Sequence, residues 1–105
     1  MEDLEKRFYY LDLFHLYGEL LSDTQKDVLV DYLECDLSLS EIAANRKISR
    51  AAVEDAIKKG KAKLEAYEAK MQLYSKRITI MNKAAILREK FGNCTEIEEI
   101  EEVLK

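Results

Sequence analysis

The stretch from Ser38 to Tyr74 has the sequence SLSEIAANRKISRAAVEDAIKKGKAKLEAYEAKMQLY, and it decides the fold. Its first part, residues 38–59, predicts a helix-turn-helix. Ser38 and Glu41 have the spacing of a capping box, in which both side chains accept hydrogen bonds from backbone N–H groups at a helix start. Ser49 is a typical cap for the helix that follows. The pattern therefore predicts two helices joined by a short turn.

The connector between these two helices contains Ile48 as its single apolar side chain, which is typical of the residue that fills a helix corner. Its two preceding residues depart from the usual pattern. Lys47 stands where glycine usually adopts the left-handed backbone conformation, at a cost of about 1 kcal/mol for a residue with a Cβ. Arg46 stands where an apolar residue is common. We therefore expect a turn that departs from the usual geometry.

The second helix of the motif continues into a heptad seam. Apolar or small residues alternate at intervals of four and three, at Val53, Ile57, Gly60, Leu64, Tyr67, Met71 and Tyr74. This repeat predicts a helix of about 25 residues with a seam for another helix. In one interpretation the seam packs on the chain's own first helix. In the other it forms a homodimer interface, with predicted contacts at Leu64, Tyr67, Met71, Tyr74 and Ile78.

Two helices are predicted before the motif. Residues 3–21 are apolar on most sides, which is typical of a central or shared helix. A second capping box, at Ser22 and Gln25, opens the helix that completes a three-helix core. We expect the outer face of that helix to carry three carboxylates that would repel phosphate, namely Asp27, Asp31 and Glu34.

Two helices are also predicted after Tyr74. Either the long helix runs on to Phe91, or it breaks near Ser75 and a new helix runs to Phe91. We favour the break, because the apolar stripe widens there. A third capping box, at Thr95 and Glu98, predicts a short acidic helix at the C-terminal end.

The composition indicates an all-α fold in one domain of 105 residues. The chain has no Pro, three Gly and no Trp. We expect a three- or four-helix core over residues 1–60, an extended helical part over 61–91 and an acidic helix over 95–105, with no wing. No stretch is apolar enough to span a bilayer. Two lone cysteines without a secretion signal indicate the cytoplasm.

The net charge of −4 hides a segregation along the chain. Residues 1–45 hold 3 basic and 11 acidic side chains, residues 46–90 hold 13 and 5, and residues 91–105 hold 1 and 5. The basic middle third is able to present a positive face to an anionic partner. The alternative is that it pairs with the acidic ends of its own chain or of a second copy.

Residues 21–75 contain four runs, LSDTQ, YLECDLSLSEIAA, ISRAAVEDAIKK and LEAYEAKMQLYS, that resemble the YlxM family of small bacterial helical proteins. The likeness covers roughly residues 10–90, and SLSEIA is also similar to DNA-binding region 4 of sigma factors. The resemblance implies a sigma-region-4-like helix-turn-helix, a dimer and a regulatory role in the signal recognition particle pathway. It implies no catalytic residues. This chain departs from the family at Lys47, Ala51, Glu54 and Ala56, which weighs against base-specific DNA reading.

The first functional hypothesis is nucleic-acid binding through the second helix of the motif. Phosphate contacts need basic side chains, and the candidates are Arg46, Lys47, Ser49, Arg50, Lys58, Lys59 and Lys61. Glu54 and Asp55 stand where a DNA groove would approach. We therefore expect weak, non-specific and strongly salt-dependent binding to DNA or to the particle RNA.

The second hypothesis is an adaptor that forms a homodimer and docks on the signal recognition particle, either on its RNA or on its GTPase. An alternative is a DNA-binding transcriptional regulator unrelated to that particle. An enzyme is not expected, because one histidine and the absence of a phosphate loop or a Cys/His cluster leave nothing to carry chemistry. No cofactor, metal, membrane or small-molecule substrate is expected.

Overall fold

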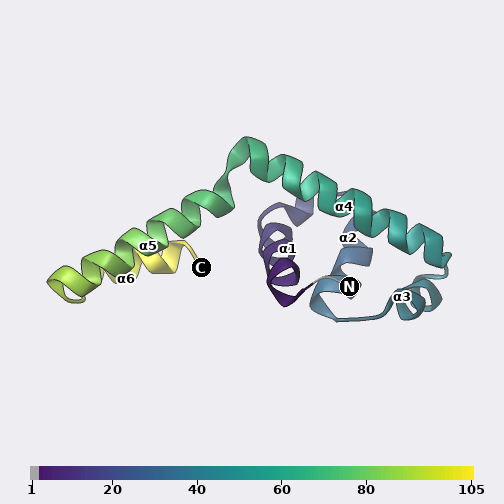
Figure 1. Ribbon diagram of the computed structural model, residues 1–105, viewed down its shortest axis with the longest axis horizontal. Coiled ribbons are helices and arrows are strands. Elements are labelled where there is room, and N and C mark those ends of the chain that lie inside the picture. Colours follow the sequence, from purple (N-terminus) through teal and green to yellow (C-terminus); the bar gives the residue numbers. More distant parts are fainter. Residues whose placement is uncertain (1–2) are drawn as a thin grey trace. The chain divides into compact units, whose positions relative to one another are not determined.

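The computed structural model describes residues 3–105, and within that range every regular element is helical (Figure 1). The all-α prediction is confirmed. In chain order the elements are α1 (Leu4–Tyr17), the 3₁₀ turn η1 (Gly18–Leu20), α2 (Asp23–Leu29), the π-helical turn η2 (Val30–Glu34), α3 (Leu39–Arg46), α4 (Arg50–Met71), α5 (Leu73–Phe91) and α6 (Thr95–Val103).

The chain forms two compact units, Met1–Met71 and Gln72–Lys105. They are separated at Gln72, whose left-handed backbone (φ 56°, ψ 30°) ends one helix and precedes the next. The predicted break is therefore present, three residues before Ser75, and Ser75 itself lies inside α5. The single domain expected from chain length stays a prediction. The boundary between the units falls after Met71 rather than near residue 60.

The core of the first unit forms where α4 packs against α1, α2 and α3 (Figure 1). Apolar side chains from all four helices, from η2 and from the link before α2 are buried there: Leu13, Phe14, Tyr17, Leu21, Val28, Leu29, Leu33, Ile42, Val53, Ala56, Ile57 and Leu64. Gly60 sets the closest approach of α4 to α2. A Cβ at this position would lie 2.8 Å from Cδ1 of Leu29, which is fully buried. The missing side chain thus allows the two helices to pack closely.

The first part of the heptad seam is used inside this unit. Leu64 is fully buried. The Tyr67 ring lies 6.1 Å from the Tyr17 ring, and its hydroxyl donates to the Leu20 carbonyl at 3.2 Å. These contacts favour the internal-seam interpretation at Leu64 and Tyr67. Further along, Met71 is 38 % exposed.

Two of the three predicted capping boxes are present. The hydroxyls of Ser22 and Ser38 accept from the N–H groups three residues on, and the Gln25 and Glu41 side chains accept from the serine N–H groups. The bond from the Ser38 N–H lowers the pKa of Glu41. The prediction of a third capping box is wrong, because α6 begins at Thr95 and Thr95 is therefore not its N-cap.

The residue that caps α6 is Cys94, which has an extended backbone and makes no side-chain capping bond. A capping box joins the N-cap residue to the residue three positions later. With Cys94 as the N-cap, that later residue is Ile97, so Thr95 and Glu98 cannot form the box. The glutamates of the first turn, Glu96 and Glu98, still lie where the helix dipole favours negative charge.

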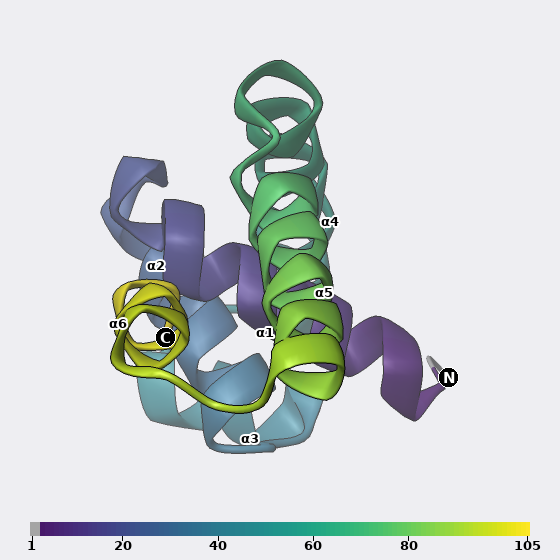
Figure 2. The ribbon, with the colours of Figure 1, turned by 90° about the vertical axis from the view of Figure 1, so that its left-hand side faces the viewer.

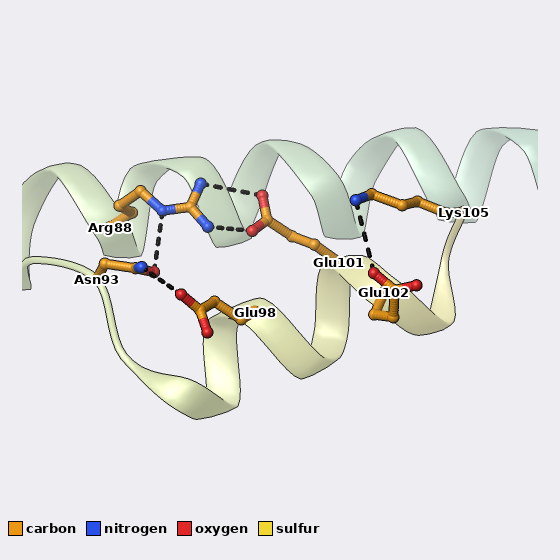
Figure 3. A network of polar contacts seen from close by, with 6 residues as sticks. All are labelled: Arg88, Asn93, Glu98, Glu101, Glu102 and Lys105. Carbon is orange, nitrogen blue, oxygen red and sulfur yellow. Dashed lines mark hydrogen bonds and ion pairs between the residues drawn. The ribbon is translucent and has the colours of Figure 1, made fainter.

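The second unit is a hairpin in which α6 lies beside α5 (Figures 1 and 2). Ala84 and Ile97 are its buried apolar residues. One edge of the hairpin is closed by a polar network, drawn in Figure 3. The Arg88 guanidinium donates two bonds to the Glu101 carboxylate, which raises the pKa of Arg88 and lowers that of Glu101.

The loop between the two helices is tied to the same network. The Arg88 Nε donates to the Asn93 side-chain oxygen at 3.2 Å, and the Asn93 amide donates to Glu98 at 2.6 Å. These bonds hold the turn between α5 and α6 with side chains from both helices. Across residues 3–105, no helix is both long enough and apolar enough to cross a bilayer.

Candidate nucleic-acid interface

Helices α3 and α4 form the helix-turn-helix, and Lys47 adopts the left-handed conformation that glycine usually takes in this turn. The expected departure from the usual geometry is therefore wrong at this residue. Lys47 has φ 57° and ψ 43°, and the Ile48 N–H after it donates to the Ala43 carbonyl at 3.1 Å. The Ser49 hydroxyl accepts from the Ala52 N–H at 3.0 Å and so caps α4. Ser49 was also a candidate for contact with phosphate. In this structure its hydroxyl is used as the N-cap of α4.

Arg46 lies at the end of α3 and is used by the fold. Its Nε and Nη2 donate to the two Asp31 carboxylate oxygens at 2.8 and 2.9 Å, and Nη1 lies 3.8 Å from Asp27. The bond with Asp31 raises the pKa of Arg46. Asp31 is only 7 % exposed, so the prediction that it lies on the outer face of its helix is wrong. A buried carboxylate needs this cation, which makes the pair a clamp between η2 and α3.

Exposed basic side chains at the start of α4 are paired with acids on the same helix. Arg50 Nε lies 3.5 Å from Glu54, and Lys59 Nζ lies 3.1 Å from Asp55. All four side chains are more than half exposed. Surface pairs of this kind are weak and screened by salt, so a phosphate is able to compete for either cation. The carboxylates nevertheless reduce the positive potential that a phosphate backbone would meet.

Lys58 lies on the exposed side of α4, and within residues 3–105 it forms no ion pair. It borders an apolar groove of about 360 Å³ between η2, α3 and α4, which is lined by Tyr32, Leu39, Glu54, Ile57, Lys58 and Lys61. Arg50, Glu54, Lys58 and Lys61 follow one another at spacings of four, four and three, which places them along one side of the helix. Lys58 and the exposed Lys47 are thus the cations of the motif that no ion pair within residues 3–105 engages.

Lys61 is held by two aromatic rings. Its Nζ lies 4.8 Å from the centre of the Tyr10 ring and 5.1 Å from that of Tyr32. Partial burial lowers the pKa of Lys61. This cation–π arrangement stabilises the ammonium close to the protein surface and withdraws it from bulk solvent. Lys61 is therefore a less available phosphate ligand than its neighbour Lys58.

Arg7 completes this cluster, and sequence reasoning missed it. Its guanidinium carbon lies 4.7 Å from the centre of the Tyr32 ring, while Nη2 donates to the Tyr32 carbonyl at 2.8 Å and to Asp36 at 2.9 Å. Residues 7, 32 and 61 come from three different elements. No local spacing pattern relates them, so only the folded chain brings them together.

The site offers exposed cations for phosphate. It offers Arg50 as the one candidate for a bidentate contact with guanine. Among residues 3–105 no group of three or more His, Cys, Asp or Glu side chains is placed to hold a metal ion. The geometry suits contact with a phosphate backbone better than reading of base edges.

Comparison with known proteins agrees with this architecture. Residues 4–103 match the model of the UPF0122 family, described as "Putative helix-turn-helix protein, YlxM / p13 like". The UPF0122 protein FN1394 of Fusobacterium nucleatum is 45 % identical over 80 residues, which cover 76 % of this chain and 78 % of that protein. A UPF0122 protein of Clostridium botulinum is 39 % identical over 93 residues, or 85 % of each chain. The chain therefore belongs to the UPF0122 family of YlxM/p13-like helix-turn-helix proteins.

Proposed function

We propose that this chain is a non-enzymatic helix-turn-helix accessory protein of the cytoplasm, which binds nucleic acid through the phosphate backbone and takes part in the signal recognition particle pathway. The observation that carries the proposal is the exposed side of α4. It presents Arg50, Lys58 and Lys59 to solvent, next to a turn that exposes Lys47. Family membership supports the helix-turn-helix role.

The same side of α4 explains why binding should be weak and general. Glu54 and Asp55 would approach phosphate together with Arg50 and Lys59, which offsets much of the Coulomb attraction. Arg46 is engaged by Asp31 and is not available without opening that pair. Few net phosphate contacts give a modest affinity, and because nearly all of it is electrostatic, binding is lost as salt rises.

The particle RNA is the target that we favour, with the particle's GTPase as the protein partner and a homodimer as the binding form. The resemblance of LSDTQ, ISRAAVEDAIKK and LEAYEAKMQLYS to the YlxM family supports the pathway. The alternative is a transcriptional regulator unrelated to the particle. It would need tight binding to one DNA sequence, and a face with one exposed arginine and two carboxylates argues against that.

Salt-dependent binding tests the proposal. The particle RNA, an unrelated RNA and a DNA duplex of equal length would be titrated with the protein over a series of salt concentrations. We expect similar, weak affinities that decrease with salt. Lys58→Gln should lower the slope of log K against log salt by about 1, as for the loss of one phosphate contact. The matched control Lys6→Gln, at an exposed residue of α1, should leave the slope unchanged.

Two results would count against the proposal. Tight binding to one DNA sequence that persists at moderate salt would favour the transcriptional regulator. Recovery of the protein from cells with neither the particle nor its RNA would argue against a role in the signal recognition particle pathway.

A further inference from the structure

Exposed apolar side chains concentrate in the second unit. Residues 72–105 make up a third of the chain, yet they hold eight of the twelve large apolar residues in residues 3–105 that are more than a third exposed: Leu73, Ile78, Ile80, Ile86, Leu87, Phe91, Ile100 and Val103. Only two of the fourteen buried apolar residues of the described chain, Ala84 and Ile97, lie there. A two-helix hairpin with so small a core needs a partner surface.

Part of this exposed set forms a groove between α5 and α6. The groove has a volume of about 560 Å³ and is lined by Ile80, Glu96, Glu99, Ile100, Val103 and Leu104. Leu87 lies seven residues after Ile80, so it extends the apolar line along α5. The Arg88–Glu101 network closes the other edge of the same helix pair (Figure 3). The hairpin thus has one polar edge and one apolar face.

Opposite charges flank the apolar face on its two sides. Lys76 and Lys83 each stand four residues before an apolar residue of α5, Ile80 or Leu87, so they lie beside the apolar line. On the other side Glu96 and Glu99 border the groove from α6. Over their full lengths, α5 holds five basic residues and one acidic residue, while α6 holds five acidic residues and no basic one.

We propose that this face, defined by Ile80, Leu87, Ile100 and Val103, is the homodimer interface, with α5 of each copy packed on α6 of the other. A twofold axis along the helices places the lysines of one copy opposite the glutamates of its partner, on both sides at once. The other twofold arrangement puts α5 on α5 and α6 on α6, and so opposes like charges. The product is a four-helix bundle in which every neighbouring pair is antiparallel.

This inference rests on the homodimer of the proposed function. It places the dimer interface on the apolar face of α5 and α6 and not on the heptad seam. The heptad pattern assigned the contact to Leu64, Tyr67, Met71, Tyr74 and Ile78. Leu64 is fully buried in the first unit and Tyr67 packs on Tyr17. Leu64 and Tyr67 are therefore not available for a dimer contact, and the apolar face of the hairpin provides a surface that is available.

Sedimentation equilibrium of the full chain, at up to about 100 µM, tests the interface. We expect a dimer for the unchanged protein and a monomer for Ile100→Lys, since the new cation faces the partner's lysines. Ile100 is already 40 % exposed, so the hairpin should keep its helix content by circular dichroism. The matched control is Phe8→Lys in the first unit, at a residue that is 56 % exposed, and it should remain dimeric.

A charge exchange separates the two twofold arrangements. Lys83→Glu and Glu99→Lys should each weaken the dimer by roughly tenfold, because each change occurs twice in the pair. The double variant should recover dimerisation if α5 packs on α6, and should not recover it if α5 packs on α5. A dimer that Ile100→Lys leaves intact, or a double variant without recovery, overturns the assigned interface while the homodimer stands. A monomeric unchanged protein overturns both.

Discussion

The Arg46 guanidinium and the Asp31 carboxylate form a two-bond ion pair between α3 and η2, with donor–acceptor distances of 2.8 and 2.9 Å. Asp31 is 7 % exposed, so loss of this partner would leave a buried carboxylate without a cation. The pair fixes the end of the first helix of the motif against the helix before it. A residue type that is common at phosphate contacts is here a structural element of the core.

Replacement of Arg46 should therefore affect folding more than binding. In Arg46→Gln the Asp31 carboxylate stays buried without its cation, and we expect the free energy of unfolding to fall by about 1–3 kcal/mol. Urea denaturation followed by circular dichroism measures this. The salt slope for RNA binding should stay the same. Unchanged stability with a reduced slope would instead make Arg46 a phosphate ligand.

The left-handed turn residue gives a second prediction. Lys47→Gly removes a Cβ from a backbone with φ 57°, and should raise the free energy of unfolding by about 0.5–1 kcal/mol after the entropic cost of glycine. The same change removes an exposed cation, so RNA affinity should fall while stability rises. Lys47→Gln is the control that removes the charge and keeps the strain. Equal stability of the two variants would show that the turn is not strained.

The two halves of the heptad seam should respond differently to truncation. Leu64→Ala leaves a cavity in the first unit and should cost about 2–5 kcal/mol of unfolding free energy. Met71→Ala, at a residue that is 38 % exposed, should cost far less, within about 1 kcal/mol. Urea denaturation at low protein concentration compares them. A large cost for Met71→Ala that grows with protein concentration would place the seam in a dimer contact.

Tyr10 gives a prediction in alkaline solution. Its hydroxyl donates to Glu65 at 2.7 Å, and this bond, with partial burial, raises the pKa of Tyr10 from 10.0 to about 12. The folded protein therefore holds this proton where the unfolded chain has lost it. The stabilisation is complete below pH 10 and decreases as the pH rises through about 12.

Phenolate absorbance against pH measures this shift. Glu65→Gln should move the Tyr10 component of the titration from about 12 towards 10, and Tyr10→Phe should remove that component. A titration that Tyr10→Phe leaves unchanged at high pH would assign the component to another tyrosine.

Local signals in the sequence predicted the helix-turn-helix. Ser38 with Glu41, and Ser22 with Gln25, are short-range capping patterns, and both form. Lys47 adopts the left-handed conformation because the motif requires it at that position, whatever its side chain. Such features depend on residues three or four apart, which is the range where sequence patterns carry most information.

Contacts between distant residues were not predictable in the same way. Asp31 was placed on the outer face because nothing near it in sequence marks its partner 15 residues away. The Arg7–Tyr32–Lys61 cluster spans three elements. The helix break at Gln72 also has no proline or glycine to announce it, which is why the prediction fell on Ser75.

Sedimentation of the purified protein with and without the particle RNA tests the central claim most directly, because it reports binding and oligomeric state together. We expect a dimer for the protein alone and a faster-sedimenting complex with the RNA at low salt, which dissociates as salt is raised. An unrelated RNA of equal length should behave similarly. Failure to cosediment with the RNA at low salt would contradict the account.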